Sequence, residues 1–199
     1  IAFDLAFKYR NPAIILADGV IGQMMEKVVL PEQRTRLTDE EVIARCPWAT
    51  TGRTHHRTPN IITSLELDPA EMEKRNIHLQ KKYAEIEENE VRFEELHCED
   101  AEYLIVAFGS CARIAQKAME IAREEGIKVG LLRPITLWPF PSKAIAARAA
   151  QVKGILTVEL NAGQMVEDVR LAVECKVPVE HFGRLGGIVP DPDLSLIHI

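Results

Sequence analysis

A regular alternation of apolar runs and amphipathic segments between Tyr103 and Phe182 constrains the fold more than any other feature of this sequence. The apolar runs have the length of strands, and the segments between them repeat apolar residues at helical spacing. These runs are Tyr103–Phe108, Ile127–Leu132, Gly154–Val158 and Val177–Phe182. Strands joined by helical crossovers lie parallel, and continuously apolar strands are typical of a sheet covered on both faces. We therefore predict an α/β fold with a three-layer domain, in which helices cover both faces of a four-stranded parallel sheet.

Capping residues support the helices of this domain. Ser110 can cap the first of them, and Gly126 follows it as the residue that most readily adopts the left-handed conformation at a helix end. The apolar face of this helix consists of Ala115, Ala118, Met119 and Ala122. Further helices are predicted over residues 142–151 and 163–173.

The first third of the chain is less regular. Residues 1–10 predict the end of a helix, which stops before Pro12 because proline disfavours a helical residue in front of it. The apolar run Ala13–Ala17 predicts a strand covered on both faces, and residues 23–28 predict a short helix. From Leu30 to Thr63 charged residues, threonine and proline predict a long connection.

A long helix is predicted from about residue 69 to residue 96. Asp68 supplies its N-cap, Pro69 its first position and Glu71 an acidic third residue. One apolar stripe repeats every seven residues and is made of Met72, Leu79, Ile86 and Phe93. The intervening heptad positions are too polar for a coiled coil, so the stripe predicts packing on a domain surface. We expect it to be more buried than Glu73, Glu87 and Glu94.

Composition and charge disfavour several classes of function. The net charge of -6 argues against nucleic-acid binding, which needs a clustered basic surface. No apolar run approaches the roughly 20 residues of a membrane span. The four cysteines, Cys46, Cys98, Cys111 and Cys175, are far apart in the sequence. No short turn therefore supplies two metal or cluster ligands, and a reduced cytoplasmic protein without a metal site is expected.

Known binding motifs are incomplete. Gly183–Gly187 lacks the lysine and hydroxyl of a P-loop, and Gly109-Ser110 lacks the spacing of a dinucleotide site. His55 and His56 are adjacent and cannot face one ligand; with two neighbouring arginines they form a basic loop, which we interpret as solvated. An anionic cofactor or a neighbouring subunit is the alternative partner of that loop. His181 is interpreted as a satisfied residue of the core or its rim.

One local pattern occurs twice. Gly22-Gln23-Met-Met-Glu follows the first predicted strand, and Gly163-Gln164-Met-Val-Glu follows the strand that ends at Val158. Such turns lie at the carboxyl edge of a parallel sheet, where ligands and partners usually bind. Two interpretations stay open: a binding edge, or a composition that strand-to-helix turns simply favour.

These segments, in their order along the chain, resemble the alpha subunit of 2-oxoacid:ferredoxin oxidoreductases. Tyr9–Met25 resembles the last strand and turn of the pyrimidine-binding domain, and Pro59–Ser64 and Glu87–Arg92 resemble the connecting segment. The following domain, which is similar to the transketolase C-terminal domain, is indicated by Leu131–Phe140, Glu159–Met165 and Phe182–Gly187. The branched-chain type, which acts on 2-oxoisovalerate, is the most similar, and the pyruvate and 2-oxoglutarate types are alternatives.

The resemblance implies four regions. Residues 1–30 would end the pyrimidine-binding domain, 31–100 would form a linker with the long helix, and 101–193 would form the transketolase C-terminal-like domain. Residues 194–199 are apolar without periodicity or cap and are expected to be non-native or disordered. Because the chain lacks an initiator methionine and opens within an amphipathic pattern, we expect a C-terminal fragment.

The resemblance also implies the chemistry of a complete enzyme. Members of this family oxidatively decarboxylate a 2-oxoacid on thiamine diphosphate and Mg²⁺, pass electrons through [4Fe-4S] clusters to ferredoxin, and form an acyl-CoA. The partners implied are a thiamine diphosphate-binding beta subunit and a ferredoxin-like subunit. Ala17-Asp18-Gly19 lacks the first glycine of the G-D-G signature for the diphosphate, so this chain is expected to bind no cofactor and to carry no catalytic residue.

What remains is a set of residues at which this chain would contact the rest of the assembly. They lie at the predicted turns and in the Arg-Pro-Ile-Thr-Leu-Trp-Pro-Phe run, and they are Asp18, Gly19, Gly22, Gln23, Arg133, Asn161, Gly163 and Gln164. Two other functions are considered: the C-terminal part of the beta subunit of a 2-oxoacid dehydrogenase complex, which works with lipoamide, and a non-enzymatic α/β interaction module.

Overall fold

The computed structural model describes residues 1–50 and 60–190 and divides the chain into two compact units. One unit contains Ile1–Ile15 and Met25–Lys82; the other contains Leu16–Met24 and the chain from Tyr83 onward. The basic loop with His55 and His56 and the tail 194–199 lie outside the described residues. None of the helices in the described ranges is long and apolar enough to cross a membrane.

The second unit is built on a five-stranded sheet in the order β1-β3-β2-β4-β5. The strands are β1 (Phe93–Leu96), β2 (Tyr103–Ala107), β3 (Val129–Pro134), β4 (Gly154–Glu159) and β5 (Val179–Gly183). The strands β2 to β5 are parallel to their neighbours, which confirms the predicted α/β fold with a parallel sheet. The additional strand β1 pairs antiparallel with β3, and the sequence analysis missed it.

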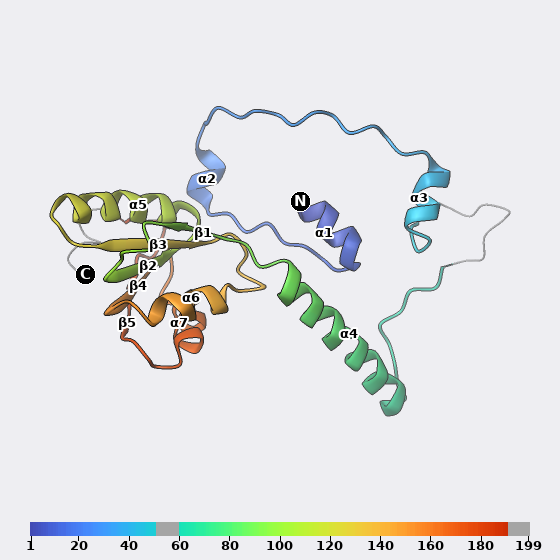
Figure 1. Ribbon diagram of the computed structural model, residues 1–199. Coiled ribbons are helices and arrows are strands. Elements are labelled where there is room, and N and C mark those ends of the chain that lie inside the picture. The colour runs from blue at the N-terminus through green and yellow to red at the C-terminus, as the bar shows by residue number, and fades with distance from the viewer. Residues whose placement is uncertain (51–59, 191–199) are drawn as a thin grey trace. The chain divides into compact units, whose positions relative to one another are not determined.

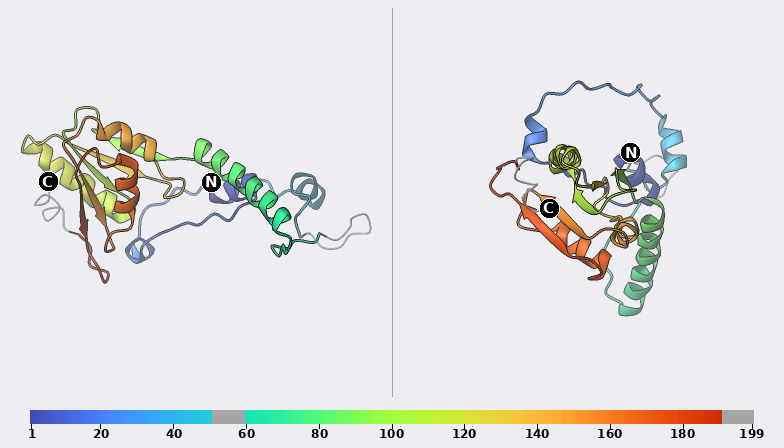
Figure 2. Two further views of the ribbon diagram at one scale, coloured as in Figure 1. Left: turned by 90° about the horizontal axis from the view of Figure 1, so that it is seen from below. Right: turned by 60° about the vertical axis from the view of Figure 1, so that its left-hand side comes forward.

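Helices cover both faces of this sheet, as Figure 1 and Figure 2 show. The helix α5 (Gly109–Glu124) lies on one face, and α6 (Ser142–Ala149) and α7 (Met165–Val173) lie on the other. Successive residues of β2 alternate between two core clusters: Ile105 packs on the α5 side, whereas Leu104 and Val106 pack on the α6 and α7 side. Each of these buried side chains stabilises the fold by about 1.5–3 kcal/mol. Burial on both faces explains why the runs carry no polar alternation.

The long helix α4 spans Pro69–Asn89 and is capped as expected, since the Asp68 carboxylate accepts the backbone N–H of Ala70 at 2.8 Å. The expectation that it continues to residue 96 is wrong, because Phe93–Leu96 pairs with β3 instead. Ladder hydrogen bonds to a strand of the core outweigh the helical spacing of these four residues.

The stripe on α4 is correctly predicted except at its last position. Met72 and Leu79 are half-buried and Ile86 is buried, whereas Glu73, Glu87 and Glu94 are exposed. Phe93 belongs to β1 and is 38% exposed, so its assignment to the buried stripe is wrong.

The first unit contains α1 (Ala2–Tyr9) and α3 (Asp39–Arg45). The expected end of the first helix is confirmed: Arg10 adopts a left-handed conformation with φ 47°. The helix α3 was not expected within the long connection, although Thr38 and Glu41 form a capping box. A strand without a neighbour has no partners for its backbone groups.

Two N-terminal expectations are wrong. Ala13–Ala17 forms no strand: none of the described residues pairs with it, and Ile14 is 87% exposed. The short helix α2 spans Gly19–Gln23 rather than 23–28, because Asp18 supplies an N-cap whose carboxylate accepts the N–H of Ile21 at 2.9 Å.

Candidate functional site at the carboxyl edge of the sheet

The topology of the second unit creates one switch point. The chain leaves β2 through α5 toward β3 on one side, and it leaves β4 through α7 toward β5 on the other side. Because β2 and β4 are neighbours in the sheet, their carboxyl ends lie where the two connections diverge. Open α/β folds usually bind ligands at this position, so its residues are the first candidates for function.

Glu159 is the most buried charged residue at the switch point. Its side chain is only 1% exposed at the end of β4. Its carboxylate accepts three backbone N–H groups at the start of α7, from Gln164 at 3.3 Å, Met165 at 2.9 Å and Val166 at 3.0 Å. These N–H groups have no partner within the helix, and a negative charge there also interacts favourably with the helix dipole. Glu159 thus fills the anion-binding end of α7 from within the protein.

His181 on β5 completes a buried polar network. Its Nδ1 lies 3.4 Å from Oε1 of Glu159 and 3.2 Å from Oγ1 of Thr157. The Thr157 hydroxyl donates to the carbonyl of Glu180, which leaves Thr157 as an acceptor and places the histidine proton on Nδ1. The expectation of a satisfied histidine is therefore wrong for one nitrogen: the buried Nε2 has no hydrogen-bond partner among the described residues.

Two glycines let the turn after β4 approach β5 closely. A Cβ on Gly183 would lie 2.2 Å from the carbonyl oxygen of Asn161 and 2.6 Å from Nε2 of His181. Gly163 has φ +109°, and its N–H donates to the side chain of Asn161 at 2.7 Å. Only glycine fits both the contact and the left-handed conformation without strain.

Asp18 lies at the start of the other helix of the switch point. A Cβ on Gly109, which has φ +59°, would lie 3.7 Å from the Asp18 carboxylate. Burial disfavours the ionised carboxylate, but hydrogen bonds from Ile21 and Ser110 outweigh it and hold the pKa of Asp18 below its usual range. The first turns of α5 and α7 are therefore each matched by a carboxylate of the protein.

The eight residues expected at the assembly interface fall into three groups. Asp18, Asn161, Gly163 and Gln164 lie at the two turns just described. Gly19, Gly22 and Gln23 lie on α2 and are exposed. Arg133 lies on β3, where its guanidinium pairs with Glu94 on β1 at 2.9 Å. Glu159 and His181 were not among the expected site residues, because their importance depends on contacts between separate elements.

The thiols of the second unit do not fit a metal ion or an iron–sulfur cluster. Burial raises the pKa of Cys98 and of Cys111 to about 11, so both stay protonated at neutral pH, whereas cluster ligands are thiolates. The negative charges of Asp18 and Glu159 also raise the pKa of Cys111. In the described ranges, no three His, Cys, Asp or Glu side chains are grouped so that they could hold a metal ion.

A diphosphate group does not fit the switch point either. The helix ends that would receive it already face the carboxylates of Asp18 and Glu159, and a third anion would meet two like charges. The residues present therefore do not form a thiamine diphosphate site.

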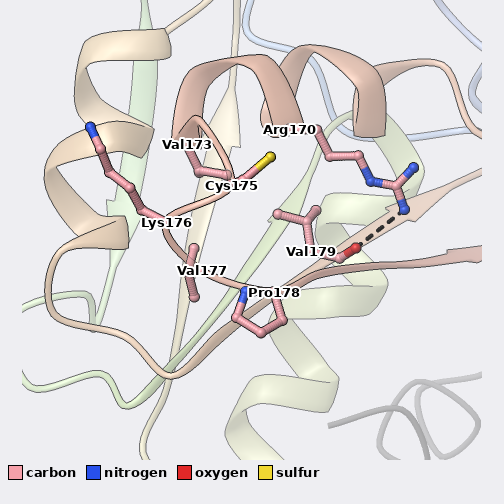
Figure 3. Close-up of a pocket in the computed structure, with 7 residues that line it drawn as sticks. All are labelled: Arg170, Val173, Cys175, Lys176, Val177, Pro178 and Val179. Carbon is pink, nitrogen blue, oxygen red and sulfur yellow. Dashed lines mark hydrogen bonds between the residues drawn. The ribbon is translucent and has the colours of Figure 1, made fainter.

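A separate hollow of about 380 Å³ lies between α7 and the start of β5 (Figure 3). Its lining contains two cations, but both are engaged: Arg170 donates to the carbonyl of Val179 at 3.2 Å, and Lys176 pairs with Glu174 at 2.8 Å. The hollow lies at the start of β5, whereas the switch point lies at the strand ends, so it adds no group to the candidate site.

Comparison with known proteins gives consistent matches. Residues 101–194 match the family described as pyruvate:ferredoxin oxidoreductase core domain II. Ketoisovalerate oxidoreductase subunit VorB of Methanothermobacter marburgensis is 48% identical over 186 residues, which cover 94% of this chain and 51% of the relative. The 2-oxoglutarate synthase subunit KorA of Archaeoglobus fulgidus is 31% identical and covers 98% of this chain and 55% of the relative. The chain thus spans about half the length of these relatives.

A solved structure supports the fold. The 2-oxoglutarate:ferredoxin oxidoreductase from Magnetococcus marinus, with 2-oxoglutarate, coenzyme A and succinyl-CoA bound, superimposes with a TM-score of 0.63 at 24% identity. It covers 73% of this chain and 27% of that chain. The alpha-subunit designation expected from the sequence is wrong in naming, because the relatives matched over nearly the whole chain are the subunits VorB and KorA.

Proposed function

Since this chain is a relative of 2-oxoacid:ferredoxin oxidoreductase subunits over nearly its whole length, we propose that it is part of such an enzyme. The enzyme would oxidatively decarboxylate a 2-oxoacid on thiamine diphosphate and form an acyl-CoA, with ferredoxin as the electron acceptor. The observation that carries this proposal is the 48% identity to VorB over 94% of the chain.

The substrate we propose is a branched-chain 2-oxoacid. The identity is 48% to the ketoisovalerate relative and 31% to the 2-oxoglutarate relative, over similar shares of this chain. The complete enzyme should therefore have a higher kcat/KM for 2-oxoisovalerate than for 2-oxoglutarate or pyruvate. An equal or reversed ranking would contradict the assignment.

The role proposed for this chain is structural, in the assembly of the complete enzyme. Its own carboxylates fill both helix ends at the switch point, and the described residues offer no metal-binding group. Thiamine diphosphate, Mg²⁺ and the iron–sulfur clusters would be held by other parts of the enzyme, including a thiamine diphosphate-binding subunit and a ferredoxin-like subunit. We place that enzyme in the cytoplasm, in agreement with the free cysteines of this chain.

The domain limits proposed are those expected from the sequence. Residues 1–30 would end a pyrimidine-binding domain, 31–100 would be a linker, and 101–193 would be the C-terminal domain that docks in the assembly. The docking edge would consist of the exposed residues Gly19, Gly22, Gln23 and Gln164, together with Asp18, Asn161 and Gly163 at the turns and Arg133 nearby.

Two measurements test the division of labour. Isothermal titration of the purified chain with thiamine diphosphate and Mg²⁺ should detect no micromolar binding. A viologen reduction assay with 2-oxoisovalerate and CoA should show turnover only when all subunits are present. Turnover by this chain alone would refute the structural role.

The docking edge is tested in the complete enzyme. The variant Gln164→Ala should weaken recovery of the other subunits in a pull-down, because it removes an exposed amide at the turn after β4. The matched control is Gln116→Ala, which makes the same change on the exposed side of α5. Equal recovery for both variants would exclude Gln164 from the interface.

A further inference from the structure

We propose that the segment Leu16–Met24, here called the strap, is an internal ligand of the switch point and that Asp18 holds it there. The strap is separated from Tyr83 by a long stretch of chain, yet it groups with the sheet-containing unit and not with the residues that flank it. This proposal does not depend on the identity of the enzyme.

Asp18 connects two helix ends. One carboxylate oxygen accepts the N–H of Ile21 at 2.9 Å and so caps α2 within the strap. The other oxygen lies 3.7 Å from the position of a Cβ on Gly109, at the first residue of α5. Ser110, the next residue of α5, hydrogen-bonds to Asp18 through its hydroxyl and its N–H. Because α5 is 16 residues long, its start carries the positive end of a helix dipole, which a carboxylate neutralises.

The strap occupies the place that an anionic ligand takes in other open α/β folds. Glu159 fills the start of α7, and Asp18 fills the start of α5, and both lie close enough to Cys111 for their charges to act on its thiol. The crevice between the ends of β2 and β4 is thus filled by two carboxylates, one from the sheet and one from the strap. A domain closed in this way fits a docking element rather than a ligand-binding one.

Polar contacts, not apolar burial, hold the strap. Leu16, Ile21 and Met24 are 68%, 40% and 52% exposed, so little apolar area of the strap is removed from water. Hydrophobic stabilisation is proportional to the buried apolar area and is therefore small here. Removal of the Asp18 carboxylate should then release the strap without unfolding the sheet.

The thiols of the chain provide a direct test in the complete 199-residue protein. Cys111 is 2% exposed at the start of α5, Cys98 is fully buried on the other face of the sheet, and Cys175 is exposed. Alkylation by iodoacetamide, followed by mass spectrometry of each cysteine peptide, reports the strap, the integrity of the core and the reagent, respectively.

The variant Asp18→Ala should raise the alkylation rate of Cys111 about tenfold, because it both opens the strap and removes a charge that disfavours the thiolate. The rates of Cys98 and Cys175 should stay within about twofold of the parent. The variant Asp18→Asn, which keeps the shape of the side chain, should give an intermediate rate. The matched control Asp39→Asn changes the same residue type in the first turn of α3 and should leave Cys111 unchanged.

Amide hydrogen exchange supplies a second readout. The Ser110 N–H precedes the first hydrogen bonds within α5, so its protection should depend on Asp18. If Asp18→Ala also accelerates labelling of Cys98, the fold has been lost, and Asp18→Asn and Ser110→Ala decide the question. A Cys111 rate and a Ser110 exchange rate that stay at the parent values in these milder variants would overturn the proposal.

Discussion

Replacement of Glu159 should destabilise the second unit more than replacement of any exposed glutamate. The carboxylate is buried and accepts three N–H groups of α7, and Nδ1 of His181 lies 3.4 Å away. In Glu159→Ala these donors lose their acceptor in a site closed to water. A buried donor without a partner costs about 1–3 kcal/mol, and loss of a helix cap costs about 0.5–2 kcal/mol. Because these contributions overlap, we expect a total loss of about 3–5 kcal/mol.

The variant Glu159→Gln separates charge from shape. Its single amide oxygen can accept some of the N–H groups, but its NH₂ group faces the others and cannot accept them. We expect a loss of about 1–2 kcal/mol, which would measure the contribution of the charge at the start of α7. The exposed Glu180 on the neighbouring strand provides the matched control, and Glu180→Gln should change stability by less than about 0.5 kcal/mol.

Urea-induced unfolding is the assay, with a probe confined to the second unit. The chain has two tryptophans, and Trp138 lies in this unit whereas Trp48 lies in the other. Fluorescence in a Trp48→Phe background therefore follows the unit that contains Glu159. A free energy of unfolding for Glu159→Gln and Glu159→Ala within about 0.5 kcal/mol of the parent would refute the capping role.

Three further predictions follow from contacts in the second unit. Gly183→Ala should cost about 2–3 kcal/mol in the same unfolding assay, because its Cβ would lie 2.2 Å from the carbonyl oxygen of Asn161; a smaller loss than that of a surface alanine would contradict the close approach. Arg148→Ala should cost about 1–2 kcal/mol, because the guanidinium makes two hydrogen bonds, of 2.9 Å and 2.6 Å, to the half-buried Glu95; Arg148→Lys should recover only part of this loss. The pKa of Asp18 is lowered by its hydrogen bonds, so its contribution is present above the unfolded pKa and is lost as the pH falls through the folded one; Asp18→Asn should flatten this acid limb of the stability curve, and an unchanged limb would disprove the contribution.

The pattern of the sequence was sufficient for the core of the second unit. Continuous apolar runs and helical spacing between Tyr103 and Phe182 predicted parallel strands with helices on both faces, and the pairing of β2 with β3 and β4 confirms this. Local signals sufficed because each strand is buried on both faces, and because each crossover helix shows its own apolar stripe. The same holds for the start of α4, where capping depends on residues adjacent in sequence.

Segments whose conformation depends on distant partners were not predictable in the same way. Phe93–Leu96 continues the spacing of a helix, but the free edge of β3 draws it into the sheet. Ala13–Ala17 has the composition of a covered strand, yet no described residue pairs with it. In both cases hydrogen bonds to residues far away in the sequence decide between helix, strand and coil, and local propensity contributes less.

The sequence by itself determined the α/β class, the order of the strands along the chain and the likeness to 2-oxoacid:ferredoxin oxidoreductase subunits. Only the tertiary structure decided what the switch point contains. Glu159 and His181 stand on different strands, and Asp18 precedes Ser110 by a long stretch of chain, so no spacing predicts that they share one edge. The physical reason is that a helix end attracts any carboxylate that the fold brings near it, and the fold alone determines which carboxylate that is.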